Sequence, residues 1–420
     1  MAEDTPYSYR LVKRIFDLIV ACVTFLFVCP FVAFAFIRNL RSAGLLQRVA
    51  LVGRDLVRFT SLTSSSATIR RAIRLVDVAR GHASIVGPRL ARIEELREDA
   101  LHIRRVVPPG LVCLQWLRIR SNVAFVPEIA SDLEYAEKRS LKLDLSIMVR
   151  ALLVSLYGKP ATHFTSTVQM LGVRIDNMTQ GHALEYIENT IDGLVGPVQI
   201  AFVNADCLNK AVAHREYRRT LNSTSLVLAD GIGVKIAGSL LSRPTRQNVN
   251  GTDLFPHLCQ MLNRKAGKLF LLGARPEVVE ALANRLRIEY PSLSLCGAAD
   301  GYFADEDVQV KQIADAAPDV LLVAMGSPIQ EQFISRNADR LGAKVSIGVG
   351  GLFDFYSGRI RRAPRWMRDS GLEWVYRLIQ EPGRMWKRYL VGNFVFLAYT
   401  LAEKFGVSYG EPNREQVRVG

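Results

Sequence analysis

The sequence contains few of the residues that disulfide frameworks and metal centres require. Its 420 residues include six cysteines and six histidines, and the cysteines lie far apart without a C-x-x-C pair. In a chain of this length, such spacing indicates free thiols in a reducing compartment and no zinc site. No G-x-G-x-x-G motif follows a predicted strand, which argues against a nucleotide-dependent oxidoreductase.

Disorder is excluded because hydrophobic residues make up 49% of the chain. The length suggests two or three domains, each large enough to bury its own core. The residues are distributed unevenly, and the first part of the chain differs in character from the rest.

An apolar segment runs from Ile15 to Ile37 with few interruptions. It is long enough to cross a bilayer, which takes roughly 20 residues. Basic residues flank both ends, and Pro30 lies in the middle, where a proline kinks or breaks a helix. The pattern favours a re-entrant hairpin with both ends on the cytoplasmic face, while a single span stays open. A signal peptide is excluded because no A-x-A site follows.

Four short motifs in the first 158 residues point to one family. They are Lys13-Arg14-Ile15-Phe16-Asp17, Cys29-Pro30, Ser84-Ile85-Val86-Gly87-Pro88-Arg89 and Pro109-Gly110-Leu111. Together they resemble bacterial polyprenyl-phosphate sugar-1-phosphate transferases. That family places an Asp-Glu pair shortly before V-G-P-R, but this chain has Arg70-Arg71 there, and arginine cannot form the phosphoryl intermediate. We interpret residues 1–158 as a mainly α-helical, membrane-docking domain without transferase chemistry.

Beyond a predicted linker at 159–169, short apolar runs alternate with amphipathic stretches. Five runs predict buried parallel strands: Val198–Val203, Ser225–Leu228, Lys268–Leu272, Val320–Ala324 and Lys344–Ile347. The stretches between them, such as 277–288 and 329–341, predict helices. This alternation indicates an α/β domain with a parallel sheet over residues 170–358.

Glycine and polar residues follow each predicted strand. The strand-end motifs are Asn204-Ala205-Asp206, Ala229-Asp230-Gly231-Ile232-Gly233, Gly273–Pro276, Gly326–Glu331 and Gly348–Asp354. Ligands bind at the carboxyl ends of parallel strands, and small residues with helix N-termini favour phosphate. One glycine turn is usually only a tight connection, but five at one edge indicate a nucleotide diphosphate site.

Further motifs extend this series: Gly251-Thr252-Asp253, Asp300–Phe303, Arg362-Ala363-Pro364 and Gly371–Arg377. In this order, residues 170–390 resemble the WecG/TagA/CpsF family of glycosyltransferases. The resemblance implies a Rossmann-like sheet domain with a basic helical appendage at 359–420. It also implies inverting transfer from a UDP-sugar to a polyprenyl-diphosphate-linked sugar, for surface or exopolysaccharide biosynthesis. The expected place is the cytoplasmic face of the bacterial inner membrane. No cofactor, metal or nucleic acid is expected, and a homo-oligomer is left open.

The resemblance also implies residue roles. Asp230 takes the position of the catalytic base, which removes the proton of the acceptor hydroxyl; the alternative is an aspartate that caps the next helix. Asn204 and Gln330 would orient sugar or phosphate oxygens. The expected substrate-binding residues are Tyr302 on uracil, Asp354 on ribose, Arg377 and Arg384 from the appendage, and Gly231 and Gly326.

Two positions depart from the family pattern. Phe202 replaces a common Thr, and Asn248 replaces an Arg, so that Arg246 or an appendage Arg would have to meet the diphosphate. Asp305-Glu306-Asp307 forms a D-x-D, which we interpret as a helix start and not a metal site, because acidic residues favour a helix N-terminus.

The last part of the chain mixes Arg and Lys with Trp366, Trp374 and Trp386. Nucleic acid or a membrane interface would suit this composition, and the apolar run at 389–401 favours the membrane. Two other functions remain open. One is a bifunctional enzyme that also makes the first lipid-linked sugar, but the missing Asp-Glu pair argues against it. The other is a non-catalytic membrane scaffold, but the presence of Asp230, Asn204 and Gln330 argues against that.

Overall fold

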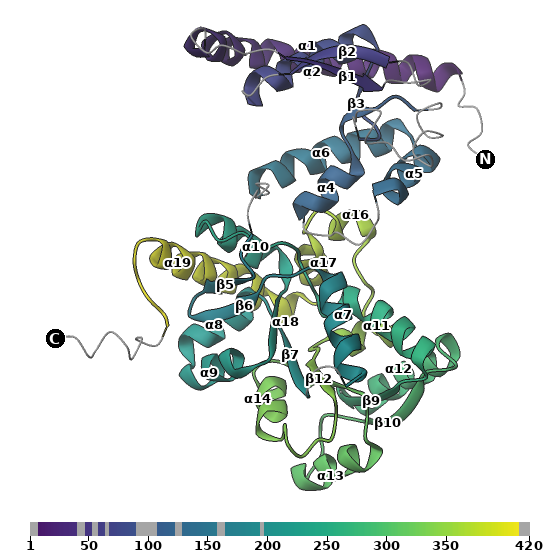
Figure 1. The fold of residues 1–420 in the computed structure, drawn as a ribbon, viewed down its shortest axis with the longest axis vertical. Coiled ribbons are helices and arrows are strands. Elements are labelled where there is room, and N and C mark those ends of the chain that lie inside the picture. Colours follow the sequence, from purple (N-terminus) through teal and green to yellow (C-terminus); the bar gives the residue numbers. More distant parts are fainter. Residues whose placement is uncertain are drawn as a thin grey trace, which may run out of the picture. The chain divides into compact units, whose positions relative to one another are not determined.

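The computed structural model describes residues 7–39, 47–52, 58–63, 67–89, 107–121, 128–157, 164–193 and 197–410 (Figure 1). The chain forms two compact units, Met1–Arg120 with Ala124–Leu156, and Ser121–Val123 with Tyr157–Gly420. Part of the predicted linker, 159–163, and the last part of the predicted appendage, 411–420, lie outside the described residues.

The N-terminal unit is mainly helical. Its elements are α1 (Tyr7–Asn39), β1 (Gln47–Val52), β2 (Arg58–Thr63), α2 (Ala67–Arg80), β3 (Ser84–Val86), β4 (Gly110–Val112), α4 (Leu114–Ser121), α5 (Glu128–Lys138) and α6 (Leu141–Tyr157). Strands β1 and β2 form an antiparallel hairpin, and β3 and β4 pair in parallel. The V-G-P-R motif therefore begins on β3, directly after α2.

Helix α1 contains the whole predicted apolar segment and continues through Pro30. The predicted helix break at Pro30 is therefore wrong. A proline removes one backbone hydrogen bond, and helix formation is cooperative, so this helix of 33 residues continues on both sides of that loss. Among the described residues, no helix is both long and apolar enough to cross a membrane. Membrane association of this unit stays a prediction.

An eight-stranded sheet forms the centre of the C-terminal unit. Its order is β10-β9-β11-β12-β7-β8-β6-β5, parallel except for β5, which pairs antiparallel with β6. The strands are β5 (Thr167–Met170), β6 (Val173–Asp176), β7 (Val198–Val203), β8 (Leu226–Ala229), β9 (Lys268–Gly273), β10 (Ser294–Ala299), β11 (Val320–Ala324) and β12 (Val345–Gly348). The strand order reverses at β7, which has β8 on one side and β12 on the other. Ligand crevices form at such a reversal.

Helices cover both faces of this sheet (Figure 1). They are α7 (Gln180–Ile191), α8 (Ala205–Ala213), α9 (Arg215–Ser223), α10 (Gly231–Leu240), α11 (Gly251–Lys265), α12 (Pro276–Glu289), α13 (Glu306–Ala316), α14 (Ile329–Arg336) and α15 (Leu352–Tyr356). Alternate residues of β7 serve the two faces: Ile200 packs with α7 and α11, whereas Ala201 packs with α8 and α10. Strands buried on both faces read as continuous apolar runs, which is why the sequence revealed them.

The predicted α/β class is confirmed, and each of the five predicted strands lies within one residue of an observed one. Three strands of this sheet, β5, β6 and β10, were not predicted. They lie at or next to the sheet edges, where the burial pattern alternates or is weak, so the sequence lacks a long apolar run there.

Five helical segments follow the sheet. They are α16 (Arg365–Arg368), α17 (Glu373–Gln380), α18 (Pro382–Trp386), the π-helical turn η3 (Lys387–Val391) and α19 (Gly392–Lys404). Helix α19 packs on α8 and α10, and its Phe396 is buried in the same core cluster as Leu208. The predicted helical appendage is therefore part of the core of this unit.

Candidate active site

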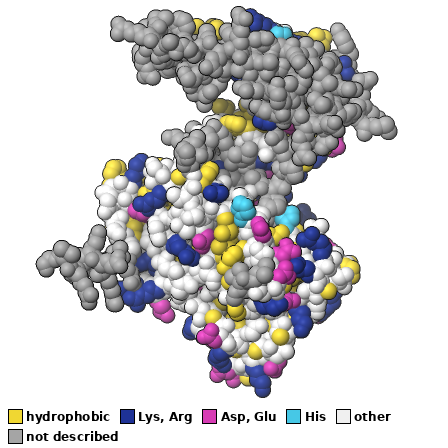
Figure 2. All heavy atoms as spheres, in the orientation of Figure 1, with side chains coloured by type: hydrophobic (Ala, Val, Ile, Leu, Met, Phe, Trp, Pro, Cys, Tyr) yellow, Lys and Arg dark blue, Asp and Glu magenta, His cyan; other side chains and the backbone are white. Residues whose placement is uncertain are grey.

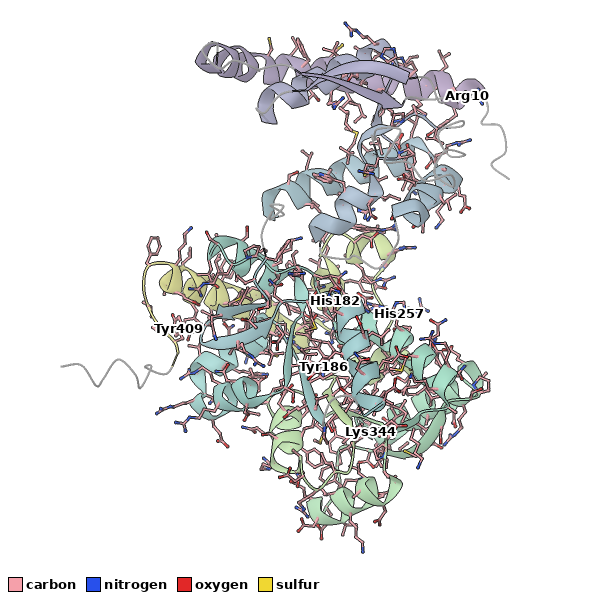
Figure 3. The ribbon with its side chains drawn as sticks, viewed as in Figure 1. Arg10, His182, Tyr186, His257, Lys344 and Tyr409 are labelled. Atoms are coloured by element: carbon pink, nitrogen blue, oxygen red, sulfur yellow. The ribbon has the colours of Figure 1, made fainter. Side chains whose placement is uncertain are left out.

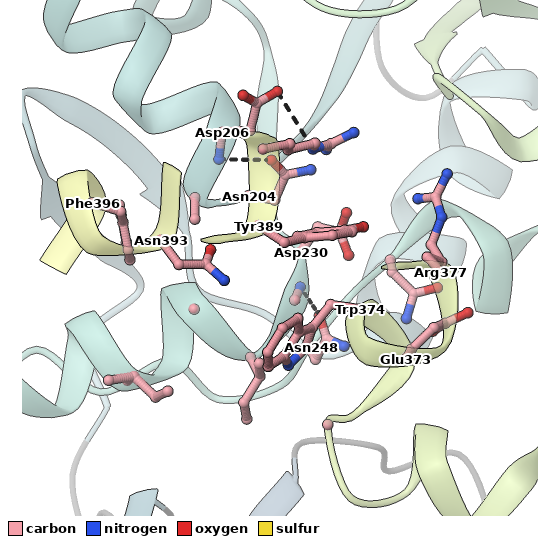
Figure 4. A pocket seen from close by; sticks show the side chains of 18 of the residues that line it. Asn204, Asp206, Asp230, Asn248, Glu373, Trp374, Arg377, Tyr389, Asn393 and Phe396 are labelled. Atoms are coloured by element: carbon pink, nitrogen blue, oxygen red, sulfur yellow. Dashed lines mark hydrogen bonds and ion pairs between the residues drawn. The ribbon is translucent and has the colours of Figure 1, made fainter. Parts of the chain in front are cut away.

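A cavity of about 360 Å³ opens at the carboxyl ends of β7 and β8. Residues after these strands form one wall, the region before and at the start of α11 forms another, and α17, η3 and α19 close the space (Figure 4). The polar lining residues are Asn204, Asp206, Asp230, Asn248, Asn250, Thr252, Arg368, Glu373, Arg377, Arg388, Tyr389, Asn393 and Thr400. The cavity therefore combines the sheet edge with the appendage.

Asn204 is fixed as the N-cap of α8. Its Oδ1 accepts hydrogen bonds from the backbone N–H groups of Asp206 and Cys207, at 3.1 and 3.2 Å. Capping directs the remaining amide group toward the cavity, where a hydrogen bond with Asp230 lowers the pKa of that carboxyl. Asn204 is held in place at the start of α8 by these capping hydrogen bonds, and it thus orients the Asp230 carboxyl group.

Asp230 occupies the N-cap position of α10, but its side chain makes no capping hydrogen bond. Instead Asn248 Oδ1 accepts the hydrogen bond of the Gly231 N–H, at 2.6 Å. The interpretation of Asp230 as a helix cap is therefore wrong. Asn248, at the position where the family often has Arg, takes over the cap, and the Asp230 carboxylate remains directed into the cavity (Figure 4).

The pKa of Asp230 is raised to about 6. Burial contributes most, since a charged carboxylate loses solvation there, and the negative charge of Glu373 adds to it. Asn204, Arg388 and Arg377 act in the opposite direction. A carboxyl group with a pKa near 6 can both accept a proton and stay mostly ionised at pH 7.

Glu373 is held at the cavity by a chain of charged groups. Its carboxylate lies 3.6 Å from Arg362 Nε, and Arg362 forms a short ion pair with Asp253. Asp253 Oδ1 also lies 3.6 Å from a guanidinium nitrogen of Arg368. The Gly-Thr-Asp and Arg-Ala-Pro motifs of the sequence thus meet, and together they fix the start of α17 beside Asp230.

Two arginines of the appendage supply positive charge to the cavity. Arg377 lies over the ring of Phe355, at 5.0 Å from its centroid, and its Nε is buried without a hydrogen-bond partner among the described residues. A buried donor of this kind normally has a partner, and a phosphate oxygen would supply one. Arg388, in η3, lies 3.6 Å from Asp206; π-helical turns are frequent at functional sites.

The structure brings four of the nine predicted site residues to this cavity: Asn204, Asp230, Gly231 and Arg377. The other five do not line it: Gln330, Tyr302, Asp354, Arg384 and Gly326. Tyr302 is 74% exposed, and Arg384 pairs with Glu381 at 3.4 Å. Asp354 is buried and pairs with Arg359 at 2.7 Å.

Gln330 connects two strand-end loops. Its Oε1 accepts hydrogen bonds from the backbone N–H groups of Gly326 and Gly350, at 3.1 and 2.9 Å, and its Nε2 donates to Glu331 at 2.7 Å. Gly326 and Gly350 have positive φ and face open space. Gln330 therefore holds the ends of β11 and β12 in place, and its role on substrate stays a prediction.

Sequence reasoning missed Glu373, Arg388 and Asn248 as site residues. Glu373 lies inside the Gly371–Arg377 motif, so its position was signalled by the motif although no role followed from it. Arg388 carried no signal that separated it from the other basic residues of the appendage. Asn248 was noted only as a departure from the family.

The structure also accounts for Phe202, the other departure from the family pattern, and for the D-x-D motif. The ring of Phe202 lies 3.1 Å from where a Cβ on Gly251 would be, so Phe202 fills the space above α11. Asp305 caps α13, its Oδ1 accepting from Asp307 N at 2.9 Å and Val308 N at 3.2 Å. The interpretation of Asp305-Glu306-Asp307 as a helix start is confirmed.

Comparison with known proteins agrees with this geometry. The model of the glycosyl transferase WecG/TagA/CpsF family matches residues 168–409. The chain belongs to the WecG/TagA/CpsF family. The model of the bacterial sugar transferase family matches residues 66–158. Both resemblances drawn from sequence motifs are thereby confirmed.

Two similar members of the WecG/TagA/CpsF family are N-acetylglucosaminyldiphosphoundecaprenol N-acetyl-beta-D-mannosaminyltransferases. The protein from Bacillus subtilis (strain 168) is 38% identical over 227 residues, which cover 54% of this chain and 87% of the relative. The protein from Staphylococcus aureus (strain MW2) is 32% identical over 225 residues, 53% of this chain and 87% of the relative. These matches cover about half of the chain.

The raised pKa of Asp230 predicts the pH dependence of activity. A base must be deprotonated to act, so activity should rise with pH through a limb near 6, the pKa of this group. Glu373→Gln removes a negative charge that raises this pKa, and the limb should move to lower pH. The measurement is kcat/KM from pH 4.5 to 8.5 for both proteins. A limb that stays in place would contradict the role of Glu373.

Proposed function

We propose that this protein transfers a sugar, with inversion, from a UDP-sugar to a polyprenyl-diphosphate-linked sugar at the membrane. The observation that carries the proposal is the Asp230 carboxylate, which caps no helix, has a pKa near neutrality and shares its cavity with Arg377 and Arg388. A base beside two cations suits direct displacement of a diphosphate from an anomeric carbon.

In this reaction Asp230 accepts the proton of the acceptor hydroxyl while the hydroxyl oxygen bonds to the anomeric carbon. The bond from that carbon to the diphosphate oxygen breaks at the same time, and UDP leaves with both electrons of that bond. Arg377, Arg388 and the N-terminus of α10 offset the negative charge that develops on the leaving group. The proton on Asp230 then returns to solvent.

An exposed apolar stripe next to the cavity supports a membrane partner. Leu390, Phe394, Leu397 and Leu401 are all exposed, and their spacing places them on one face of the η3–α19 helix. Leu397 also lines the cavity. Among the described residues on the face shown in Figure 2, the basic side chains are spread out and form no continuous stripe of the kind that tracks nucleic acid.

The test is UDP release by the full chain in detergent, with a panel of UDP-sugars and synthetic lipid-diphosphate sugars. The names of the relatives make UDP-N-acetylmannosamine and a lipid-diphosphate N-acetylglucosamine the first pair to try. We expect UDP release that requires the lipid acceptor and survives EDTA. No release with any pair would favour a scaffold, and release of UMP would favour a bifunctional enzyme.

A further inference from the structure

An acidic side chain lies in the wall of the cavity at the ends of β7 and β8. Asp206, in the first turn of α8, lines this cavity close to Arg388 of η3 (Figure 4). A carboxylate repels phosphate oxygens, and it attracts the guanidinium group that would bind them. A diphosphate can therefore use Arg388 only if another group satisfies Asp206.

Two cations share one oxygen of Asp206. Lys210, one turn further along α8, places its Nζ 2.9 Å from Asp206 Oδ2. Arg388 Nε lies 3.6 Å from the same oxygen, which is beyond the range of a normal hydrogen bond. Lys210 is thus the close partner of Asp206, and Arg388 is the distant one.

A second contact fixes the ammonium group of Lys210. Its Nζ also donates a hydrogen bond to the backbone carbonyl oxygen of Ser327, at 2.9 Å, in the loop between β11 and α14. Ser327 is held in turn, because its Oγ donates to the buried carboxylate of Glu331 at 2.8 Å. Two contacts on different loops hold this lysine more firmly than the single contact of an ordinary exposed ion pair.

The guanidinium group of Arg388 keeps its hydrogen-bond donors. Among the described residues, Arg388 makes no hydrogen bond, and its one ion pair is the distant contact with Asp206. Its other contact is with the ring of Tyr389, whose centroid lies 5.7 Å away. A guanidinium with free donors on a cavity wall suits phosphate oxygens, which it can bind through two parallel hydrogen bonds.

The availability of Arg388 matters more in this chain than in a family member that has an Arg at position 248. Asn248 stands at that position and caps α10. Arg246, the other basic residue nearby in sequence, lies over the ring of Phe164 at 5.7 Å and does not line the cavity. A basic residue of the appendage therefore has to supply the charge that position 248 lacks.

We propose that Lys210 is a positioning residue for the diphosphate of the UDP-sugar: it occupies Asp206 and so leaves Arg388 free to bind phosphate oxygens. Lys210 does not line the cavity, so it acts through Arg388 and does not touch the substrate. Without Lys210, Asp206 Oδ2 loses its close partner, and Arg388 moves to hydrogen-bond distance from it. This inference rests on the proposed function, because it concerns how the leaving diphosphate is held.

The experiment measures binding of UDP to the full chain in detergent near pH 7, by calorimetry. Lys210→Met keeps the length of the side chain but removes its charge, and it should weaken UDP binding by about tenfold, within the range of coupling in one ion-pair network. Adding Asp206→Asn to Lys210→Met should restore most of the affinity, because an amide does not hold Arg388 as a carboxylate does. Asp206→Asn alone should tighten binding, since it removes a negative charge near the diphosphate.

Lys344→Met is the matched control. Lys344 is also held by one carboxylate and one carbonyl oxygen, those of Asp319 at 2.8 Å and Ile191 at 2.9 Å. It precedes β12, at the amino ends of the strands and outside the cavity (Figure 3). Its replacement should leave UDP binding unchanged. Lys210→Arg keeps the charge and should recover most of the affinity that Lys210→Met loses.

The double variant separates positioning from a purely structural role, since removal of a second charged group cannot repair a fold weakened by loss of an ion pair. In steady-state assays, Lys210→Met should raise KM for the UDP-sugar more than it lowers kcat. Wild-type affinity in Lys210→Met, or no recovery in the double variant, would overturn the inference. If the wild-type chain itself does not bind UDP, the proposed function fails, and this result is distinct from either of those two.

Discussion

Asp230→Asn is expected to lower kcat by about 10²- to 10⁴-fold, the usual contribution of a general base. Asparagine has nearly the same shape but cannot accept the proton of the acceptor hydroxyl. Because Asp230 makes no capping hydrogen bond, the exchange should leave the helix start intact. The measurement is steady-state UDP release, together with the affinity for UDP, which should change little.

The matched control for this variant is Asp305→Asn. Asp305 also stands at a helix N-terminus, where its side chain does cap the helix, and it is exposed. Asn caps about as well as Asp, so stability and activity should both be retained. A fall in activity of Asp230→Asn no larger than that of Asp305→Asn would remove Asp230 from the mechanism.

Arg377→Ala is expected to reduce kcat/KM by about 10- to 150-fold, which corresponds to the loss of a charge-assisted hydrogen bond worth about 1.5–3 kcal/mol. Its buried Nε has no hydrogen-bond partner among the described residues, so the donor is available to the diphosphate. Arg377→Lys should recover only part of the loss, because lysine keeps the charge but lacks the planar fork.

The control here is Arg361→Ala, an exposed arginine of the same appendage that does not line the cavity. It should retain activity within about twofold, as surface substitutions away from a site usually do. The prediction fails if Arg377→Ala and Arg361→Ala lower kcat/KM to the same extent, since the appendage would then act through its overall charge.

The sequence was informative wherever burial or a motif constrained the residues. Strands β7, β8, β9, β11 and β12 are buried on both faces, so their apolar runs were readable. Asn204 and Asp230 follow such strands, and the ends of parallel strands meet at one edge, so their proximity was predictable.

The rest of the site depends on long-range packing. Arg362 and Asp253 hold Glu373 near Asp230, and no local pattern encodes the pairing of Arg362 with Asp253 across 109 residues. Tyr302 shows the converse: it stands in a motif, yet its side chain is exposed and lies outside the cavity. Motif membership located the region of each residue, whereas tertiary packing decided which side chains face the cavity.

The packing of α19 on α8 also has a consequence for synthesis of the chain. Asn204 and Thr400 both line the cavity, and ribosomes add about 5–20 residues per second. Synthesis of Asn204 therefore precedes synthesis of Thr400 by about 10–40 seconds. The last strand, β12, ends at Gly348, so the whole sheet can form before α19 is made, while the apolar face that later receives Phe396 is still uncovered. Nascent chains should therefore attract chaperones at α8, and the cavity should be complete only after α19 has emerged.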